Sequence, residues 1–354
     1  MNDNNFIKQL EKTGISKKSV EKKILKLNDK IKTMDLKKSN FRYYPSNINK
    51  NNSKNAYVTI IFGGDAYIPG ILALGHSLRL TKTKYKLICM VQDKDEDNFK
   101  GLNKDMIDEI NTIYDLVVGI DLLKTNFESE YFKKNKEYYK NIQYYTTKNQ
   151  MFGLYDYDKI LYLDASCIVK NNIDYILNDY IFYDYDISTY KYNFDYDEFE
   201  LTKMGLHGNY YLIIPTIELY NKSLYLISNY SKFFENEYFI YSNDEIITFF
   251  TIYPEWNDKK NTMFSNKDID KTYSTNIISG LNINYNKYKN NSDVYKYVRD
   301  KPFRFNTTFD ENYLKNNKLI NYLEWDLIVK DLIKTNSNYK KYFEYIKTFR
   351  ETFF

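Results

Sequence analysis

A strand, a helix and a second strand follow one another in the first third of the chain, and this order most constrains the fold. Residues 57–62 (YVTIIF) are apolar and β-branched, as in a buried strand, and Gly63-Gly64 ends the run. Residues 68–80 (IPGILALGHSLRL) have apolar side chains at helical spacing and a proline in the first turn. Residues 86–91 (KLICMV) form another buried-strand run. This is the order of a βαβ unit, which predicts a parallel sheet in an α/β protein.

Further apolar runs extend the predicted sheet. Residues 159–163 (KILYL) indicate a third strand that ends at Asp164, and residues 210–214 and the run before Lys301 also have strand character. Ligands of open parallel sheets gather at the carboxyl ends of the strands. Gly63-Gly64 and Asp164 both follow strands, so the sequence predicts a binding site at that edge.

Helical patterns cover residues 138–155, residues 244–251 and both ends of the chain. Near the N-terminus, one or two amphipathic helices present apolar side chains on a Lys-rich surface: Val20, Ile24, Leu25, Leu27 and Ile31. Near the C-terminus, NYLEWDLIVKDLIK has an apolar side made of Leu323, Leu327, Val329 and Leu332. We predict a helical N-terminal extension and linker (1–55), one α/β domain (56–310) and a C-terminal helical tail (311–354).

Charge and cysteine content exclude several classes of protein. The chain has 51 basic and 47 acidic side chains, a net charge of +4, which is too balanced for nucleic acid or an anionic membrane as the main partner. Its two cysteines, Cys89 and Cys167, lie in apolar runs, so neither a disulfide framework nor a cysteine zinc site is expected. Without a long apolar run or a secretory signal, we expect a soluble, cytoplasmic protein.

Six segments in order resemble glycogenin and its relatives, glycosyltransferase family 8. They are YVTIIFGGDAYIPGILALGHSLRLTKTKYKLICMV, TTKNQMFGLYDYDKILYLDASCIVKNNIDYIL, HGNYYLIIPTIELYNKSL, NDEIITFF, LNINYN and DKPF, within about residues 56–305. The resemblance implies a GT-A α/β fold with a mixed, mostly parallel sheet flanked by helices. It also implies transfer of a sugar from a UDP donor, usually with retention of anomeric configuration.

The metal site of that family is changed here. Its Asp-x-Asp motif and a distant His hold Mn²⁺, and the matching positions are Asp164, Ala165, Ser166 and Tyr295. A serine hydroxyl and a phenol are weaker ligands than a carboxylate and an imidazole. We therefore expect Mn²⁺ or Mg²⁺ to bind only weakly without the donor, through Asp164 and Ser166, and more tightly when the donor diphosphate supplies further oxygens. The alternative role of Asp164 is structural, as the cap of the next helix.

The resemblance assigns further residues to the donor. Tyr67 matches the tyrosine that stacks on uracil, with Gly63-Gly64 and Asp65 beside it. Lys148 lies near the phosphate and sugar, and Lys301 contacts the diphosphate as a point charge. His207 stands at a position that borders the donor sugar, as a replacement ligand or an acceptor contact.

Asp244 and Glu245 are the candidate catalytic pair, because they resemble the family's Asp-Gln pair at the donor sugar. A Glu in that place adds a carboxylate that could stabilise an oxocarbenium-like state or act as a nucleophile. Two alternatives remain open. Alignment on the following phenylalanines moves the motif to Ser242-Asn243, and an acidic pair at a helix N-terminus is also favoured by the helix dipole.

The predicted function is transfer of a hexose, most simply glucose, from UDP to an unknown acceptor, which is a sugar, a protein or the chain itself. Formation of a homodimer is one of the alternatives that the sequence leaves open. The second hypothesis is a catalytically weak or silent UDP-sugar-binding protein, because Ser166 and Tyr295 replace metal ligands. A third, nucleic-acid binding through the Lys-rich N-terminal segment, is supported by no motif.

Overall fold

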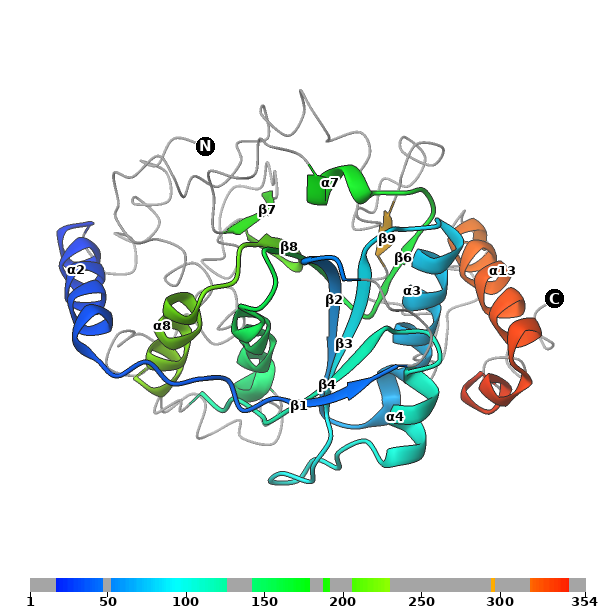
Figure 1. Cartoon of the computed structure of the whole chain (residues 1–354), viewed down its shortest axis with the longest axis horizontal. Helices are drawn as coiled ribbons and strands as arrows, with labels where there is room; N and C mark the ends of the chain where they lie inside the picture. The colour runs from blue at the N-terminus through cyan, green and yellow to red at the C-terminus, as the bar shows by residue number, and fades with distance from the viewer. Residues whose placement is uncertain are drawn as a thin grey trace.

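One mixed sheet organises the protein. The computed structural model describes residues 17–46, 52–125, 142–178, 187–191, 206–229, 294–296 and 319–343. In this part of the chain, the sheet has seven strands in the order β1-β4-β3-β2-β5-β8-β7 (Figure 1). Their bounds are β1 (Arg42–Pro45), β2 (Asn55–Ile61), β3 (Lys86–Gln92), β4 (Leu116–Ile120), β5 (Lys159–Leu163), β7 (Ile187–Lys191) and β8 (Leu206–Ile213).

The centre of the sheet is parallel and its outer strands are antiparallel. β2 pairs in parallel with β3 and with β5, and β3 pairs in parallel with β4. β1 is antiparallel to β4, and β8 is antiparallel to both β5 and β7. Four parallel strands in the middle match the βαβ unit read from the sequence, and the architecture is consistent with the GT-A fold. The predicted α/β class is confirmed.

Helices cover both faces of the sheet, because alternate residues of the buried strands point to opposite sides. Tyr57 and Ile61 of β2 belong to the apolar core beneath α3 (Ile68–Leu80), α4 (Lys104–Ile110) and α7 (Asp174–Asn178). Val58 and Ile60 belong to the core beneath the 3-10 helix η2 (Ile142–Gly153) and α8 (Ile217–Ser228). Figure 1 shows α3 and α4 on one side of the sheet and α8 on the other.

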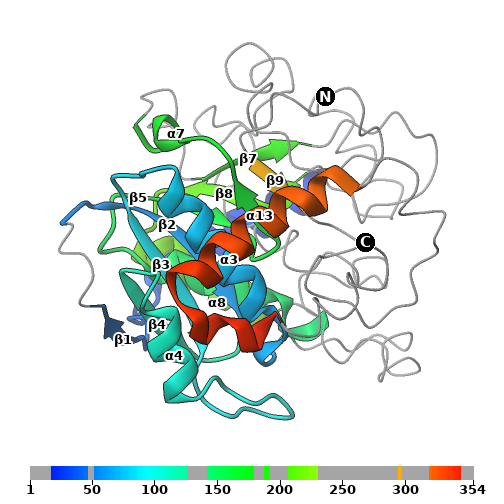
Figure 2. The ribbon, with the colours of Figure 1, turned by 90° about the vertical axis from the view of Figure 1, so that its right-hand side faces the viewer.

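The terminal segments pack onto these layers. α2 (Lys17–Thr33) is one helix that lies beside α8 in Figure 1, and its Leu27 and Ile31 are buried. α13 (Leu319–Thr335) runs along α3 in Figure 2, and the 3-10 helix η7 (Ser337–Tyr342) follows it. His76 of α3 lies within hydrogen-bonding distance of Asp331 of α13, with 2.8 Å between Nε2 and Oδ2, so this histidine joins the two helices.

Two of the predicted apolar sides need correction. Leu25 is 57% exposed and Leu327 is 66% exposed, although both were placed on buried sides. In α13 the buried residues are Trp325, Val329 and Leu332, which are spaced by four and three residues and lie on one side of a helix. Leu327 lies two residues from Trp325, on another side.

Several segments differ from the sequence prediction in detail. Residues 142–153 of the predicted helix 138–155 form a 3-10 helix, and neither β4 nor α4 was predicted. Cys89 and Cys167 are both buried, and neither is part of a disulfide. Among the helices that the structure describes, none has the length and apolar character needed to cross a bilayer. The predicted helix 244–251 lies outside the described residues.

Candidate functional site at the carboxyl edge of the sheet

The predicted binding residues are carried by one edge of the sheet. β2 and β5 are adjacent and parallel, with Val58 opposite Tyr162, so the chain leaves both strands on the same side. The turn after β2 begins at Gly63, and the turn after β5 begins at Asp164. The two turns that were predicted separately from sequence therefore leave neighbouring strands at one edge.

The turn after β2 depends on glycine. Gly63 and Gly64 have φ values of 79° and 107°, in the region that side chains disfavour. The backbone N–H of Gly63 donates to Oε1 of Gln92 at 2.9 Å. The 3-10 helix η1 (Asp65–Tyr67) follows, with an exposed Asp65 and a half-buried Tyr67 that packs against the core. The glycines thus turn the chain so that Asp65 comes to the surface beside Tyr67.

The turn after β5 closes on itself. The backbone N–H of Ser166 donates to Oδ1 of Asp164 at 2.9 Å, and the Ser166 hydroxyl donates to the same oxygen. The backbone N–H of Cys167 donates to the Asp164 carbonyl at 2.9 Å. Ala165 and Ser166 are buried, and Asp164 is half-buried. Asp164 thus shapes this turn as well as bringing a carboxylate to the edge.

Backbone pairing between strands places two further predicted positions, Tyr295 and His207, near the turn after β5. β6 (Cys167–Val169) starts directly after Ser166 and pairs with β9 (Val294–Lys296), with Ile168 opposite Tyr295. In β8, Tyr210 is opposite Leu163 and the strand runs antiparallel to β5. His207, three residues earlier in β8, is therefore at the carboxyl end of β5.

The remaining predicted residues divide into two groups. Lys148 lies in η2, on the face of the sheet covered by α8, and is half-buried. Asp244, Glu245 and Lys301 lie outside the described residues. Their assignment to the site remains a prediction.

The donor atoms at Asp164 do not by themselves make a site for a divalent cation. Mn²⁺ and Mg²⁺ favour several oxygen ligands, which for Mg²⁺ are usually one or two carboxylates together with waters and substrate phosphates. Here one carboxylate is accompanied by a hydroxyl that is directed at it. Within the described ranges, no group of three metal-ligating side chains occurs. We therefore derive no chemical step through a metal.

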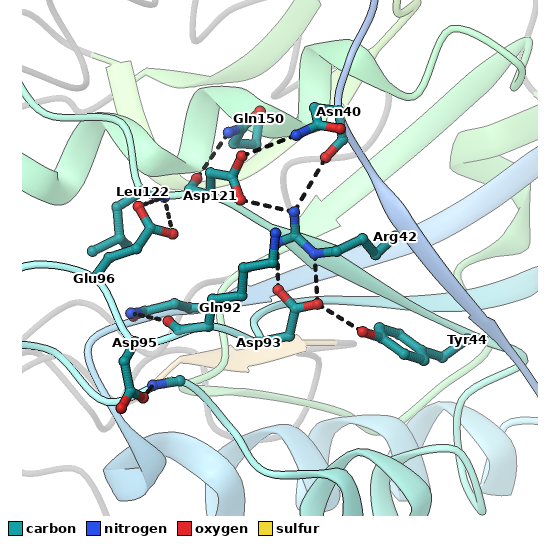
Figure 3. Close-up of polar contacts among 12 residues, drawn as sticks. Asn40, Arg42, Tyr44, Gln92, Asp93, Asp95, Glu96, Asp121, Leu122 and Gln150 are labelled. Carbon is teal, nitrogen blue, oxygen red and sulfur yellow. Dashed lines mark hydrogen bonds and ion pairs between the residues drawn. The ribbon is translucent and has the colours of Figure 1, made fainter.

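Sequence reasoning missed an ionic network at the ends of β3 and β4 (Figure 3). Arg42 of β1 forms a two-pronged ion pair with Asp93, with one bond of 2.7 Å from Nε to Oδ2. Its Nη1 donates to Oδ1 of Asp121 at 2.8 Å. The hydroxyl of Tyr44 donates to Oδ2 of Asp93 at 2.8 Å. One arginine thus joins the carboxyl ends of two parallel strands.

Neighbouring groups extend this network. Asn40 Nδ2 donates to Oδ2 of Asp121 at 3.3 Å, and Gln150 Nε2 donates to the Asp121 carbonyl at 2.9 Å. A Cβ atom at Gly119 would lie 2.1 Å from Oδ2 of Asp93, so only glycine leaves room for this carboxylate. The network therefore also links the sheet edge to η2, which carries Gln150 and Lys148.

Ionisation in this network follows from its hydrogen bonds. Burial alone would raise the pKa of Asp93, but the hydrogen bonds from Arg42 and Tyr44 outweigh it and the pKa is lowered. The bond to Asp93 raises the pKa of Arg42. Glu96 differs, because burial raises its pKa despite the backbone N–H that Leu122 donates to it. The Arg42–Asp93 pair is therefore ionised at neutral pH.

The two aspartates of this network could have been found by looking for acidic residues directly after apolar strand-like runs. Asp93 follows a predicted strand just as Asp164 does, and Asp121 follows the apolar run LVVGI. Arg42 gives no local signal, because it lies 51 residues from Asp93 and 79 from Asp121.

The order of the strands and the polar residues at the carboxyl edge of the sheet are consistent with an α/β protein of the GT-A type.

Sequence comparison identifies proteins that are similar to this chain. No family model matches the chain. It is 25% identical to a glycogenin of Neurospora crassa over 115 residues, 32% of this chain and 15% of that one. It is 30% identical to galactinol synthase 2 of Arabidopsis thaliana over 128 residues, 35% and 34% of the two chains.

The resemblance to glycogenin-like family 8 glycosyltransferases is confirmed by these relatives. An uncharacterized protein of Acanthamoeba polyphaga mimivirus is 34% identical over 125 residues, 35% of this chain and 40% of that one. The chain thus spans less than half the length of each of these relatives. Among solved structures, the glycosyltransferase GlyE of Streptococcus pneumoniae TIGR4 has a TM-score of 0.47 at 15% identity, covering 80% of this chain and 64% of GlyE. An active-site mutant of LgtC has 0.49 at 11%, covering 81% and 99%.

Proposed function

We propose that this protein is a glycosyltransferase that moves a hexose from a UDP-sugar to an acceptor. Its named relatives include glycogenin and galactinol synthase, which support transfer of a sugar. Glucose is the donor sugar that we would test first. The acceptor is a sugar, a protein or the chain itself, and the proposal does not choose among these.

The observation that carries this proposal is the pair of turns that leave β2 and β5 at one edge of the sheet. The first turn brings Asp65 and Tyr67, and the second brings Asp164. Adjacent parallel strands of this kind form the usual crevice for nucleotides in α/β proteins. Tyr67 offers a ring on which uracil can stack, and such contacts suit a half-buried aromatic side chain.

Charge must be neutralised as the bond between sugar and diphosphate breaks, because negative charge grows on the leaving oxygens. We assign this task to Lys148 and Lys301, each of which acts as a point charge on phosphate oxygens. Asp244 and Glu245 are proposed at the sugar end, where a carboxylate stabilises positive charge on the anomeric carbon. His207 is proposed to border the donor sugar.

A second candidate function is binding of a UDP-sugar without efficient turnover. The Ser166 hydroxyl donates to Asp164 and stands where the family has its second carboxylate. A diphosphate would then be neutralised by lysines alone. This favours a slow enzyme or a sensor of the nucleotide sugar.

Calorimetric titration with UDP, CDP and ADP tests the nucleotide site, and turnover of UDP-glucose with and without chelator separates the two functions. UDP should bind much more tightly than CDP or ADP, because Tyr67 lies in a turn that resembles a uracil site. Equal affinities for all three would contradict the proposal. Binding of UDP without release of glucose would favour the second function.

A further inference from the structure

Gln92 links the two loops that leave β2 and β3. Its side chain, at the end of β3, is 1% exposed. Oε1 accepts the backbone N–H of Gly63 at 2.9 Å, while Nε2 donates to the carbonyls of Lys94 at 2.9 Å and Phe99 at 3.3 Å. Gln92 is drawn in Figure 3 at the edge of the sheet, among the residues that end the strands. All three hydrogen bonds of this buried amide are made to backbone.

The loop that Gln92 holds is closed by its own backbone. Glu96 and Phe99 exchange N–H to carbonyl hydrogen bonds of 3.0 and 2.9 Å. The backbone N–H of Leu102 donates to the Gln92 carbonyl at 2.8 Å. Residues 94–99, called here the β3 loop, therefore form a firm support for the side chain of Gln92.

The β3 loop also reaches the second predicted donor segment. The Phe99 ring fills the space beside Gly63, where a Cβ atom would lie 3.4 Å from it. The same ring packs in a T-shaped arrangement with Tyr144, with 5.0 Å between ring centroids. Tyr144 belongs to η2, four residues before Lys148. The β3 loop thus contacts both the glycine turn and the helix that carries Lys148.

The hydrogen bond to Gln92 holds the first residue of the turn after β2. The N–H of Gly63 is held by Gln92, and glycine itself offers no side chain to restrict the backbone. Asp65 and Tyr67 follow within four residues, so a change in the turn moves both. A buried amide that stabilises one turn conformation therefore determines where the predicted uracil contact lies.

We propose that Gln92 is a positioning residue for nucleotide binding, acting through Gly63 rather than by touching the donor. This rests on the proposed function. The β3 loop supports the same turn through Phe99. The expected role is in affinity for the nucleotide, because the turn at Gly63 leads directly to Asp65 and Tyr67, the residues proposed to meet the nucleoside.

Replacement of Gln92 by the similarly shaped methionine tests this role, with Asn221→Leu as the matched control. Asn221 is also 1% exposed and its amide also makes three backbone hydrogen bonds, accepting from Lys37 N–H and donating to the carbonyls of Lys37 and Ile217. Both variants should lose similar thermal stability. By calorimetry, UDP should bind about tenfold more weakly to Gln92→Met and within about twofold of wild type to Asn221→Leu. In turnover, Gln92→Met should raise KM for the UDP-sugar and leave kcat nearly unchanged.

Three outcomes would overturn the inference. Unchanged UDP affinity in Gln92→Met would overturn it alone and leave the proposed function standing. An equal loss of affinity in both variants would reduce Gln92 to a purely structural role. A wild-type chain that does not bind UDP would overturn the proposed function and this inference with it.

Phe99→Leu provides a second test if Gln92→Met fails to fold. The half-buried ring can be shortened while the hydrogen bonds of Gln92 remain. UDP should then bind about threefold more weakly, a smaller change because only packing beside Gly63 is lost. Wild-type affinity in this variant would overturn the inference.

Discussion

The two halves of the sheet's carboxyl edge are built differently. The ends of β3 and β4, called here the clamped half, bring Asp93 and Asp121 together under Arg42. The ends of β2 and β5, called here the glycine half, expose Asp65 and present Asp164 in a tight turn. In the clamped half both carboxylates are paired with one guanidinium of the chain itself. The glycine half carries the residues proposed to meet a ligand.

This difference separates stability from binding along one edge. The charges of Arg42, Asp93 and Asp121 are held in an internal network, so changes to these three residues should mainly alter folding. Changes in the glycine half should mainly alter affinity or turnover. Variants in the two halves should therefore differ in whether stability or turnover is lost.

Arg42→Met should cause the largest loss of stability. Asp93, whose side chain is 2% exposed, would keep a buried charge without its partner, and we expect a loss of about 3 kcal/mol. Urea unfolding measures this loss. Lys104→Met is the control, since the Lys104–Asp108 pair is exposed and contributes about 0.3 kcal/mol. Similar losses in both variants would remove the distinction between clamped and exposed pairs.

Asp164→Asn should affect turnover rather than folding. Asparagine retains an oxygen that can accept from the Ser166 backbone, so the turn should persist, while the negative charge is lost. We expect turnover of the UDP-sugar to fall about 100-fold, equivalent to about 2.7 kcal/mol. Steady-state kinetics and a thermal melt measure the two effects. A large fall in melting temperature with unchanged turnover would reverse the assignment of this half.

Ser166→Asp should restore part of a metal site. A second carboxylate beside Asp164 should tighten Mn²⁺ binding in the presence of UDP by about tenfold, or about 1.4 kcal/mol. Titration of Mn²⁺ with and without UDP measures this effect. Unchanged metal affinity, together with wild-type turnover in excess chelator, would indicate an enzyme that neutralises the diphosphate with lysines. Tight binding of Mn²⁺ to the wild type without UDP would make His207 the first residue to test.

The smallest effect concerns pH. The pKa of Asp93 is lowered in the folded protein, so its ion pair contributes stability above the ordinary aspartate pKa of about 4. That contribution is lost as pH falls through the lowered value. The stability gap between wild type and Arg42→Met should therefore narrow in acid. Urea unfolding of both proteins at decreasing pH checks this, and a gap that stays constant through the acid range would be inconsistent with it.

Local patterns predicted the centre of the fold better than its margins. The helix expected over residues 68–80 is α3, and the run 159–163 is β5, because long apolar patterns specify buried elements. β1 was missed, since RYYP is short, contains a proline and is only half-buried. Its pairing with β4 joins residues more than 70 positions apart, which no local pattern encodes.

In the candidate site, too, some features follow from local sequence patterns and others do not. Gly63, Tyr67 and Asp164 could be predicted because they follow or lie close to strands and match a family motif. The bond from Gly63 to Gln92 depends on two loops meeting in space, so it required coordinates. Asp244, Glu245 and Lys301 stay predictions from the resemblance alone.

β1 pairs with a strand that is synthesised later than β1 itself, and this limits the order in which the sheet can form. During synthesis, residues 42–45 leave the ribosome well before Leu116–Ile120, the strand with which they pair. Arg42 can therefore pair only after both of its carboxylate partners have been synthesised. A shortened chain that begins at residue 56 would contain every predicted donor residue and still lack Arg42. We expect such a chain to expose the edge of β4 and to self-associate through it.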